Sequence, residues 1–175
     1  MIKIKSNSRD ERLFSMTWEL YRKSFPVEEQ RPLNKHLQAM CNSKFHPYIY
    51  TTEEADLLAI CFYWDFHDFK YLEHFSVNPN YRNRGIGSEI IRSFNEDKYP
   101  VILEIEPPID EISKQRLKFY ERNNFKETGY IFKQLKYQKN NKDVLLELLC
   151  NKEMNGDFFQ KFQHTIYHEL AIYCD

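Results

Sequence analysis

The chain has 175 residues, of which 42% are hydrophobic and 16% aromatic, and both kinds are spread along its length. This length and composition are typical of one folded domain that needs neither disulfide nor metal for stability. Twenty-five basic and 26 acidic residues leave a formal net charge of -1, with no long block of one sign. The balance argues against a nucleic-acid-binding protein, because phosphate backbones are bound by basic surfaces.

The first residues, 1–12, become charged within a few positions and lack the apolar core of a signal peptide. No apolar run reaches the length of a membrane span. We therefore predict a cytoplasmic protein with a single domain over residues 1–175 and with no membrane partner.

The cysteines and histidines give no sign of a metal site or a disulfide. No CxxC pair occurs, and His164 and His168 lie four residues apart without the carboxylate of an HExxH motif. We predict that the cysteines are small buried hydrophobic residues. They are Cys41, Cys61, Cys150 and Cys174.

The N-terminal part of the chain predicts one strand and two helices. Apolar and charged residues alternate at 1–5, which indicates a strand with one buried face. Residues 9–24 repeat apolar side chains at helical spacing, and Pro26 ends this helix because the residue before a proline is driven from the helical region. A shorter helix is predicted at 33–41.

The middle of the chain predicts a hairpin followed by alternating strands and helices. Residues 48–66 are rich in β-branched and aromatic side chains around a turn near 53–56. Residues 71–79 alternate again, and 99–108 contain a compact apolar strand. Residues 110–125 predict a helix that is entered through acidic side chains, which suit its positive end.

Two more strands are predicted within residues 127–138 and 143–150, and the tail from 157 to 173 has a helical apolar pattern. No internal repeat or linker divides the chain. The order of elements predicts an α+β fold in which helices cover a mostly antiparallel sheet.

The chain has four glycines, and two of them, Gly85 and Gly87, lie between a predicted strand and an apolar helical pattern. The first turn of a helix has unpaired N–H groups and partial positive charge, and glycine lets a ligand approach that backbone. Arg82 and Arg84 add charge that suits phosphate oxygens. The segment predicts either an anion site or an ordinary helix start with exposed arginines.

Two common phosphate loops do not fit this segment. A Walker loop needs lysine and Ser/Thr after its second glycine, but Ser88 and Glu89 follow Gly87. A Rossmann fingerprint needs its third glycine where this chain has Ile90, within a βαβ order that is absent.

Residues 82–87, "RNRGIG", resemble the pyrophosphate loop of the GNAT superfamily of acyl-CoA-dependent N-acyltransferases, Gln/Arg-x-x-Gly-x-Gly/Ala. Residues 116–130, "RLKFYERNNFKETGY", resemble the second signature of that superfamily. Asn124 stands where the signature has glycine, and asparagine is among the few residues that tolerate the left-handed conformation. The order of elements is also similar, so the resemblance covers most of the chain.

The resemblance implies a GNAT-like mixed, mostly antiparallel sheet of about seven strands, flanked by helices and followed by a C-terminal helix. It implies transfer of an acetyl group from acetyl-CoA to a primary amine of a small, unidentified acceptor, by direct attack in a ternary complex and without a metal. The alternative is a non-catalytic acyl-CoA-binding module with a regulatory or assembly role. In both cases we expect the chain to be a monomer or a homodimer.

The resemblance also implies which residues bind acetyl-CoA. Backbone amides of the glycine loop would hold the pyrophosphate, and main-chain groups at the end of the fourth strand would pair with the pantetheine arm. The strand at 101–106 would splay away to admit the cofactor. These cofactor-binding residues are Phe75, Ser76, Val77, Arg82, Asn83, Arg84, Gly85, Ile86, Gly87 and Ser88.

For catalysis, the resemblance maps the acid that protonates the leaving thiolate onto Tyr120. Glu73 is the first candidate base, because its parity with Phe75 and Val77 puts the three side chains on one face of a strand without a bulge. Glu104 and Glu106, on the next strand, are the alternatives, since a carboxylate among apolar neighbours has a raised pKa that suits a base.

Four residues are candidates for acceptor binding. Glu106 shares the parity of Glu104 on the same strand. Glu28 and Glu29, in the connector between the first two helices, could attract a cationic amine, and Arg31 could orient a carboxylate. An ordinary charged loop is the alternative for this connector.

Overall fold

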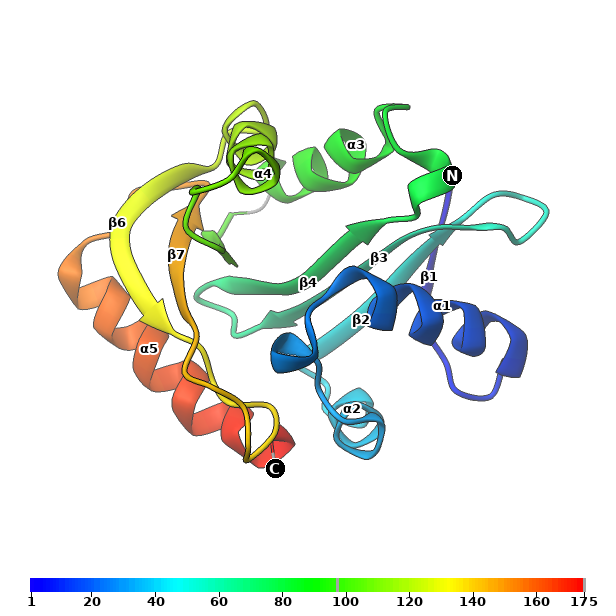
Figure 1. Ribbon diagram of the computed structural model, residues 1–175, viewed down its shortest axis with the longest axis horizontal. Coiled ribbons are helices and arrows are strands. Elements are labelled where there is room, and N and C mark those ends of the chain that lie inside the picture. The colour runs from blue at the N-terminus through cyan, green and yellow to red at the C-terminus, as the bar shows by residue number, and fades with distance from the viewer. Residues whose placement is uncertain (97, 175) are drawn as a thin grey trace.

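In a computed structural model, which describes residues 1–96 and 98–174, the chain forms one seven-stranded sheet with helices on both faces (Figure 1). The strand order is β1-β2-β3-β4-β5-β7-β6. Every neighbouring pair is antiparallel except β4 and β5, which run parallel. The predicted α+β class and order of elements are confirmed. The elements are β1 (Ile2–Lys5), α1 (Glu11–Ser24), α2 (Leu33–Met40), β2 (Phe45–Thr51), β3 (Leu57–Asp65), β4 (Lys70–Val77), α3 (Ile86–Ser93), β5 (Val101–Ile105), α4 (Glu111–Glu121), β6 (Lys126–Lys133), β7 (Leu145–Cys150) and α5 (Gly156–Leu170).

Two apolar clusters fill the two sides of the sheet. One cluster joins α1, α2 and α5 to the sheet through side chains such as Leu20, Ala39 and Phe162. The other joins α3 and α4 to the opposite face through Ile90 and Tyr120. In Figure 1, α3 and α4 accordingly lie together at the top, and α5 runs across β6 and β7 at the lower left.

Local signals explain where the helices begin and end. Helix α1 begins at Glu11 because the side chain of Asp10 accepts a hydrogen bond from Leu13 N at 3.0 Å. It ends at Ser24, as the following Phe-Pro pair predicts. After α4, Asn124 has a φ of 68°, so the predicted left-handed asparagine is confirmed.

Strand β4 separates from β5 halfway along its length. The two strands pair only from Lys70 to Leu72, against Val101 to Leu103. At the same point a bulge shifts the register of β4 against β3, between the pairs that contain His74 and Leu72. The expected splaying of these strands is therefore confirmed. The β5-facing edge of β4 has no strand partner beyond Leu72 within the described chain.

A buried ion pair lies at this bulge. Arg31, on the segment before α2, places Nη2 2.5 Å from Glu73 Oε1, and both side chains are fully buried. Trp64 Nε1 donates to Glu73 Oε2 at 2.9 Å, and the Tyr137 hydroxyl donates to Oε1 at 2.7 Å. The guanidinium carbon also lies 5.3–5.7 Å from the ring centroids of Phe45, Trp64 and Tyr137. Parts of the chain distant in sequence therefore meet at one carboxylate.

The carboxyl of Glu73 is ionised in this setting. Burial alone would raise its pKa, but the charge of Arg31 and hydrogen bonds from His74 and Tyr137 outweigh burial and lower the pKa far below the ordinary value. A permanently charged buried carboxylate is stable only while its partners stay in place.

The environments of the cysteines agree in part with the prediction. Cys61, Cys150 and Cys174 are buried, whereas Cys41 is exposed, so the prediction is wrong for Cys41. Cys41 directly follows α2 on the solvent side, where the apolar pattern of that helix no longer constrains it. None of the helices in the described chain is long and apolar enough to cross a membrane.

The ion pair gives a first testable prediction. Arg31→Met should lower the free energy of unfolding by about 3–5 kcal/mol, because it leaves the carboxylate of Glu73 buried and uncompensated. The double variant Arg31→Met/Glu73→Gln should lose clearly less stability, since the amide is neutral, its oxygen still accepts from Trp64, and its NH2 group can donate to the Tyr137 hydroxyl. Urea unfolding at pH 7 of both single variants and the double variant measures the coupling. Additive losses would show that the two side chains do not act as a pair.

Candidate active site

The separation of β4 from β5 opens a cavity of about 490 Å³. Its walls come from the end of β4, from β5, from the first turn of α3, from α4 and from the turn between α1 and α2. The cavity brings together most of the predicted site residues, and Arg84, Glu28 and Arg31 lie outside its lining. The predicted residues that line it are Glu29, Glu73, Phe75, Ser76, Val77, Arg82, Asn83, Gly85, Ile86, Gly87, Ser88, Glu104, Glu106 and Tyr120.

The glycine loop turns sharply into α3 at one end of the cavity. Asn83 and Gly85 both have left-handed backbone conformations, with φ of 61° and 80°. Gly85 precedes the first residue of α3, and no side chain caps that helix. The unpaired N–H groups of its first turn are therefore free to bind an anion.

Gly87 has a packing role that its sequence context does not reveal. A Cβ at this position would lie 3.3 Å from Phe119 Cζ and 3.3 Å from Val77 Cγ2. The small residue lets the first turn of α3 sit tightly between β4 and α4. The loop is thus held at the point where β4 leaves the sheet.

The two arginines beside the loop are oriented differently. Arg82 Nε donates to the carbonyl of Val77 at 3.1 Å, which keeps this side chain at the cavity. Arg84 lies over the ring of Tyr81, 5.2 Å from its centroid, and points outside the cavity lining. Arg82 is therefore the better placed of the two for a ligand inside the cavity.

Asn123 connects the loop to α4, a role that the sequence did not predict. Its side-chain amide donates to Ser88 Oγ at 3.2 Å and to the carbonyl of Phe119 at 2.7 Å, and the residue is only 1% exposed. In the sequence, this asparagine lies simply within the helix that is predicted at 110–125. Its hydrogen bond to Ser88 on α3 depends on the tertiary packing of α3 against α4.

Glu104 is a buried carboxyl on β5. The hydroxyl of Tyr71 donates to its Oε1, and its Oε2 is buried without a hydrogen-bond partner. Burial raises the pKa of Glu104 well above the ordinary value, and the nearby charge of Glu29 raises it further, while a hydrogen bond with the side chain of Gln134 lowers it in part. This carboxyl therefore takes up a proton far more readily than an exposed glutamate.

Tyr120 reaches the same cavity from α4 and is 8% exposed. Burial raises the pKa of its hydroxyl, which stays protonated across the neutral range. One turn earlier on α4, Arg116 Nη1 lies 2.9 Å from Glu106 Oε2. The cavity thus contains a protonated hydroxyl, a protonatable carboxyl and a neutralised ion pair.

The expected position of Glu73 is wrong in one respect. The bulge in β4 puts its side chain on the opposite face of the sheet from Phe75 and Val77, with the buried Trp64. Glu73 still touches the cavity, but its carboxylate is committed to Arg31 and has a lowered pKa. Its environment disfavours proton uptake.

The connector between α1 and α2 also differs from the expectation. Arg31 is buried, and the carboxylate that it orients is the internal Glu73. Glu28 is exposed, and its backbone carbonyl accepts a hydrogen bond from Asn141. Of the acidic pair, only Glu29 faces the cavity.

Gln134 and Arg116 are among the lining residues that were not predicted. Arg116 could have been found, because it lies four residues before Tyr120 and therefore on the same face of α4. Gln134 follows the end of β6, and no pattern in the sequence distinguishes it. It enters the cavity because β7 is inserted between β5 and β6.

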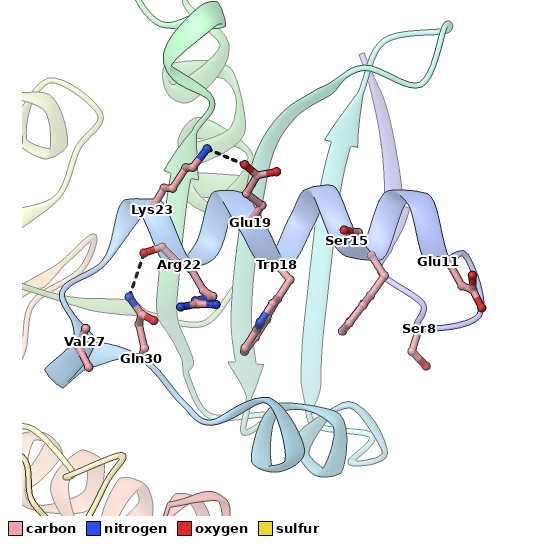
Figure 2. A pocket seen from close by; sticks show the side chains of 10 residues that line it. Ser8, Glu11, Ser15, Trp18, Glu19, Arg22, Lys23, Val27 and Gln30 are labelled. Atoms are coloured by element: carbon pink, nitrogen blue, oxygen red, sulfur yellow. Dashed lines mark hydrogen bonds and ion pairs between the residues drawn. The ribbon is translucent and has the colours of Figure 1, made fainter.

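A second hollow, of about 760 Å³, follows the outer side of α1 (Figure 2). Figure 2 shows Trp18 and Arg22 on the same side of the helix, with Lys23 paired to Glu19 and Gln30 donating to the carbonyl of Arg22. None of the predicted site residues lines this hollow. It is therefore not the candidate active site, although it is the larger space.

The described residues contain no group of three or more His, Cys, Asp or Glu side chains that could hold a metal ion. His164 and His168 stack on one another along α5, with ring centroids 5.8 Å apart.

Comparison with known proteins identifies this architecture. The model of the acetyltransferase (GNAT) domain matches residues 45–127. "Putative acetyltransferase YjbC" of Bacillus subtilis (strain 168) is 27% identical over 167 residues, which cover 91% of this chain and 84% of that protein. A solved structure described as "Putative acetyltransferase from GNAT family from Bacteroides thetaiotaomicron" is 28% identical, with a TM-score of 0.85 over 99% of this chain and 98% of the other.

A more distant structure has the same fold. An aminoglycoside 6'-N-acetyltransferase complexed with coenzyme A is 13% identical, with a TM-score of 0.61 over 89% of this chain and 99% of the other. The chain shares the fold of these acetyltransferases, and in this structure the sheet opens between β4 and β5. Residues 45–127 are a GNAT acetyltransferase domain, and over most of its length the chain is similar to proteins described as putative acetyltransferases.

The environment of Glu104 generates a second prediction. Its pKa is raised in the folded protein, so wild type should lose stability as pH rises from about 4.5 through the folded pKa, by about 1.4 kcal/mol per pH unit in that window. Glu104→Gln lacks this titration and should gain stability relative to wild type over the same range. Urea unfolding at pH 5 and pH 8 measures the difference.

Glu73→Gln is the matched comparison, because its pKa shift has the opposite sign. The free energy of unfolding of wild type should exceed that of Glu73→Gln most at neutral pH. This difference should shrink as pH falls below about 4.5 and through the pKa of Glu73 in the folded state. If the stability difference from wild type changed with pH in the same direction for Glu104→Gln and Glu73→Gln, the environments assigned to the two carboxyls would be wrong.

Proposed function

We propose that this acetyltransferase moves an acetyl group from acetyl-CoA to a primary amine of a small acceptor, by direct attack in a ternary complex. The observation that carries the proposal is the shared cavity. It joins an uncapped helix start at Gly85 to a buried carboxyl at Glu104 and a buried hydroxyl at Tyr120. An anion-binding end and a proton-transfer end are what such a transfer requires.

The residues present fit coenzyme A. Backbone amides from Arg82 to Ser88 would hold the pyrophosphate at the start of α3, with Arg82 adding charge. The unpaired edge of β4, from Phe75 to Val77, would offer main-chain groups to the pantetheine arm, because β5 has left that edge. Acetyl-CoA, when bound there, supplies the thioester whose carbonyl is attacked.

Glu104 is the base in this proposal. An amine reaches the site as an ammonium ion and must lose one proton before its nitrogen can attack. Glu104 Oε2 has no other hydrogen-bond partner and accepts that proton. As the new C–N bond forms, the C–S bond breaks, and Tyr120 donates its phenolic proton to the departing sulfur. The acetylated nitrogen then releases its excess proton, which returns to the Tyr120 phenolate, and Glu104 gives the first proton to solvent.

A third prediction tests the cofactor loop. Gly85→Ala forces a left-handed alanine, at a cost of about 1–2 kcal/mol in stability, and should weaken coenzyme A binding at least about tenfold by moving the loop amides. Gly129→Ala is the matched control, because Gly129 has a φ of 77° and its added Cβ also meets open space. Calorimetric titration with coenzyme A compares the two. If both variants lost the same affinity for coenzyme A, the glycine loop would not be part of the binding site.

A fourth prediction tests the proton-transfer groups. Glu104→Gln and Tyr120→Phe should each lower kcat about a hundredfold in a thiol-release assay with acetyl-CoA and an amine panel. In wild type, kcat/KM should rise with pH through the raised pKa of Glu104, and this limb should vanish in Glu104→Gln. The raised pKa of Tyr120 predicts no falling limb near neutrality.

The chain offers controls outside the cavity. Tyr50→Phe removes a buried hydroxyl from the same apolar cluster, and Glu147→Gln removes a carboxylate from the adjacent strand β7. Both should retain activity close to wild type. If Tyr120→Phe retained as much activity as Tyr50→Phe, the acid role would belong elsewhere. Acetyl-CoA binding without thiol release for any amine would favour a binding module.

A further inference from the structure

The acceptor end of the cavity has an excess of hydrogen-bond acceptors. Glu104 Oε2 and Gln134 Oε1 are both buried and have no hydrogen-bond partner, and Gln134 is only 8% exposed. Both residues line the cavity. An unpaired buried acceptor is costly, so these atoms call for a ligand that donates hydrogen bonds. A primary ammonium group carries three N–H donors and no acceptor.

A second, separate carboxylate lies in the same region. Glu29 is part-buried in the turn after α1 and lines the cavity. No hydrogen bond or salt bridge engages its carboxylate within the described chain. Burial raises its pKa; the charges of His74 and Arg116 oppose this rise, and that of Glu106 adds to it. Arg116 is itself paired with Glu106, so Glu29 has no cation of its own.

The two carboxylates belong to residues that line the same cavity, and the charge of Glu29 contributes to the raised pKa of Glu104. The remaining acids of the lining are already neutralised, Glu73 by Arg31 and Glu106 by Arg116. The acceptor end therefore carries two carboxylates without cationic partners. One cationic amine would neutralise only one of them, and two cationic centres would neutralise both.

We infer that the acceptor is a diamine or a related amine with a second fixed positive charge, held by Glu29 while the reacting nitrogen sits at Glu104 and Gln134. This inference rests on the proposed function. The reacting ammonium gives one proton to Glu104 before attack. The second ammonium keeps its proton, stays bound to Glu29 and takes no part in the bond changes.

The test compares 1,3-diaminopropane through 1,6-diaminohexane, each with the n-alkylamine of the same length, by thiol release from acetyl-CoA at fixed pH and ionic strength. The best diamine should exceed its matched monoamine in kcat/KM at least about tenfold after its two equivalent amines are allowed for. The corresponding ω-amino acid, which has a carboxylate at the far end, should fall below the monoamine, because Glu29 repels it.

Glu29→Gln should reduce the diamine preference to less than about threefold. Glu28→Gln is the matched control, because Glu28 lies in the same turn but is exposed and outside the cavity lining, and it should keep the full preference. Calorimetric titration of diamine into each variant saturated with coenzyme A gives a second readout. Thermal melts establish that each variant is folded.

The outcomes separate this inference from the proposed function. Equal kcat/KM for diamines and monoamines, or an unchanged preference in Glu29→Gln, would overturn the second cationic centre and leave amine acetylation in place. Thiol release that no amine of the series stimulates would overturn both.

Discussion

The site depends on one constraint, the loss of pairing between β4 and β5 after Leu72. A continuous parallel pair would satisfy the backbone of both strands and leave no space between them. The separation instead exposes a main-chain edge and opens the cavity, while β3 keeps the other edge of β4 hydrogen-bonded. Helix α3 begins beside that opening, and Gly87 allows its first turn to pack closely against Val77 of β4 and Phe119 of α4. The end of the cavity that we propose for the cofactor follows from this geometry.

A bulge at Glu73 lies where β4 separates from β5, and it determines where the carboxylate of Glu73 points. It directs this carboxylate to the face of the sheet opposite Phe75, where Arg31, Trp64 and Tyr137 enclose it. The resulting pair ties the segment before α2 to β4. Two buried glutamates near the separation therefore differ in kind, because Glu73 has a cation beside it and Glu104 does not. Their pKa values shift in opposite directions for that reason.

The elements and the glycine loop were predictable because their signals are local. Proline after α1, asparagine in the left-handed region after α4 and alternation in the strands each act within a few residues. The face on which Glu73 lies was not predictable. A bulge reverses which side chains of a strand share a face, and no residue pattern in this sequence indicates the bulge. The burial of Arg31 and the entry of Gln134 likewise depend on pairings across the sheet. Glu29 and Glu28 are adjacent and alike in sequence, and only the fold distinguishes them.

The segment between β6 and β7 closes over the turn after α1, since Gln138 Nε2 donates to the carbonyl of Val27 and Asn141 Nδ2 to that of Glu28. These contacts join positions 111 and 113 residues apart. On a ribosome, the chain through α4 contains the glycine loop and Tyr120, but the acceptor end still lacks this segment and Gln134. In the proposed site, the residues that would bind the donor are thus all present once α4 has been made, whereas the acceptor end, which already includes Glu29, is complete only after Gln134 and this segment.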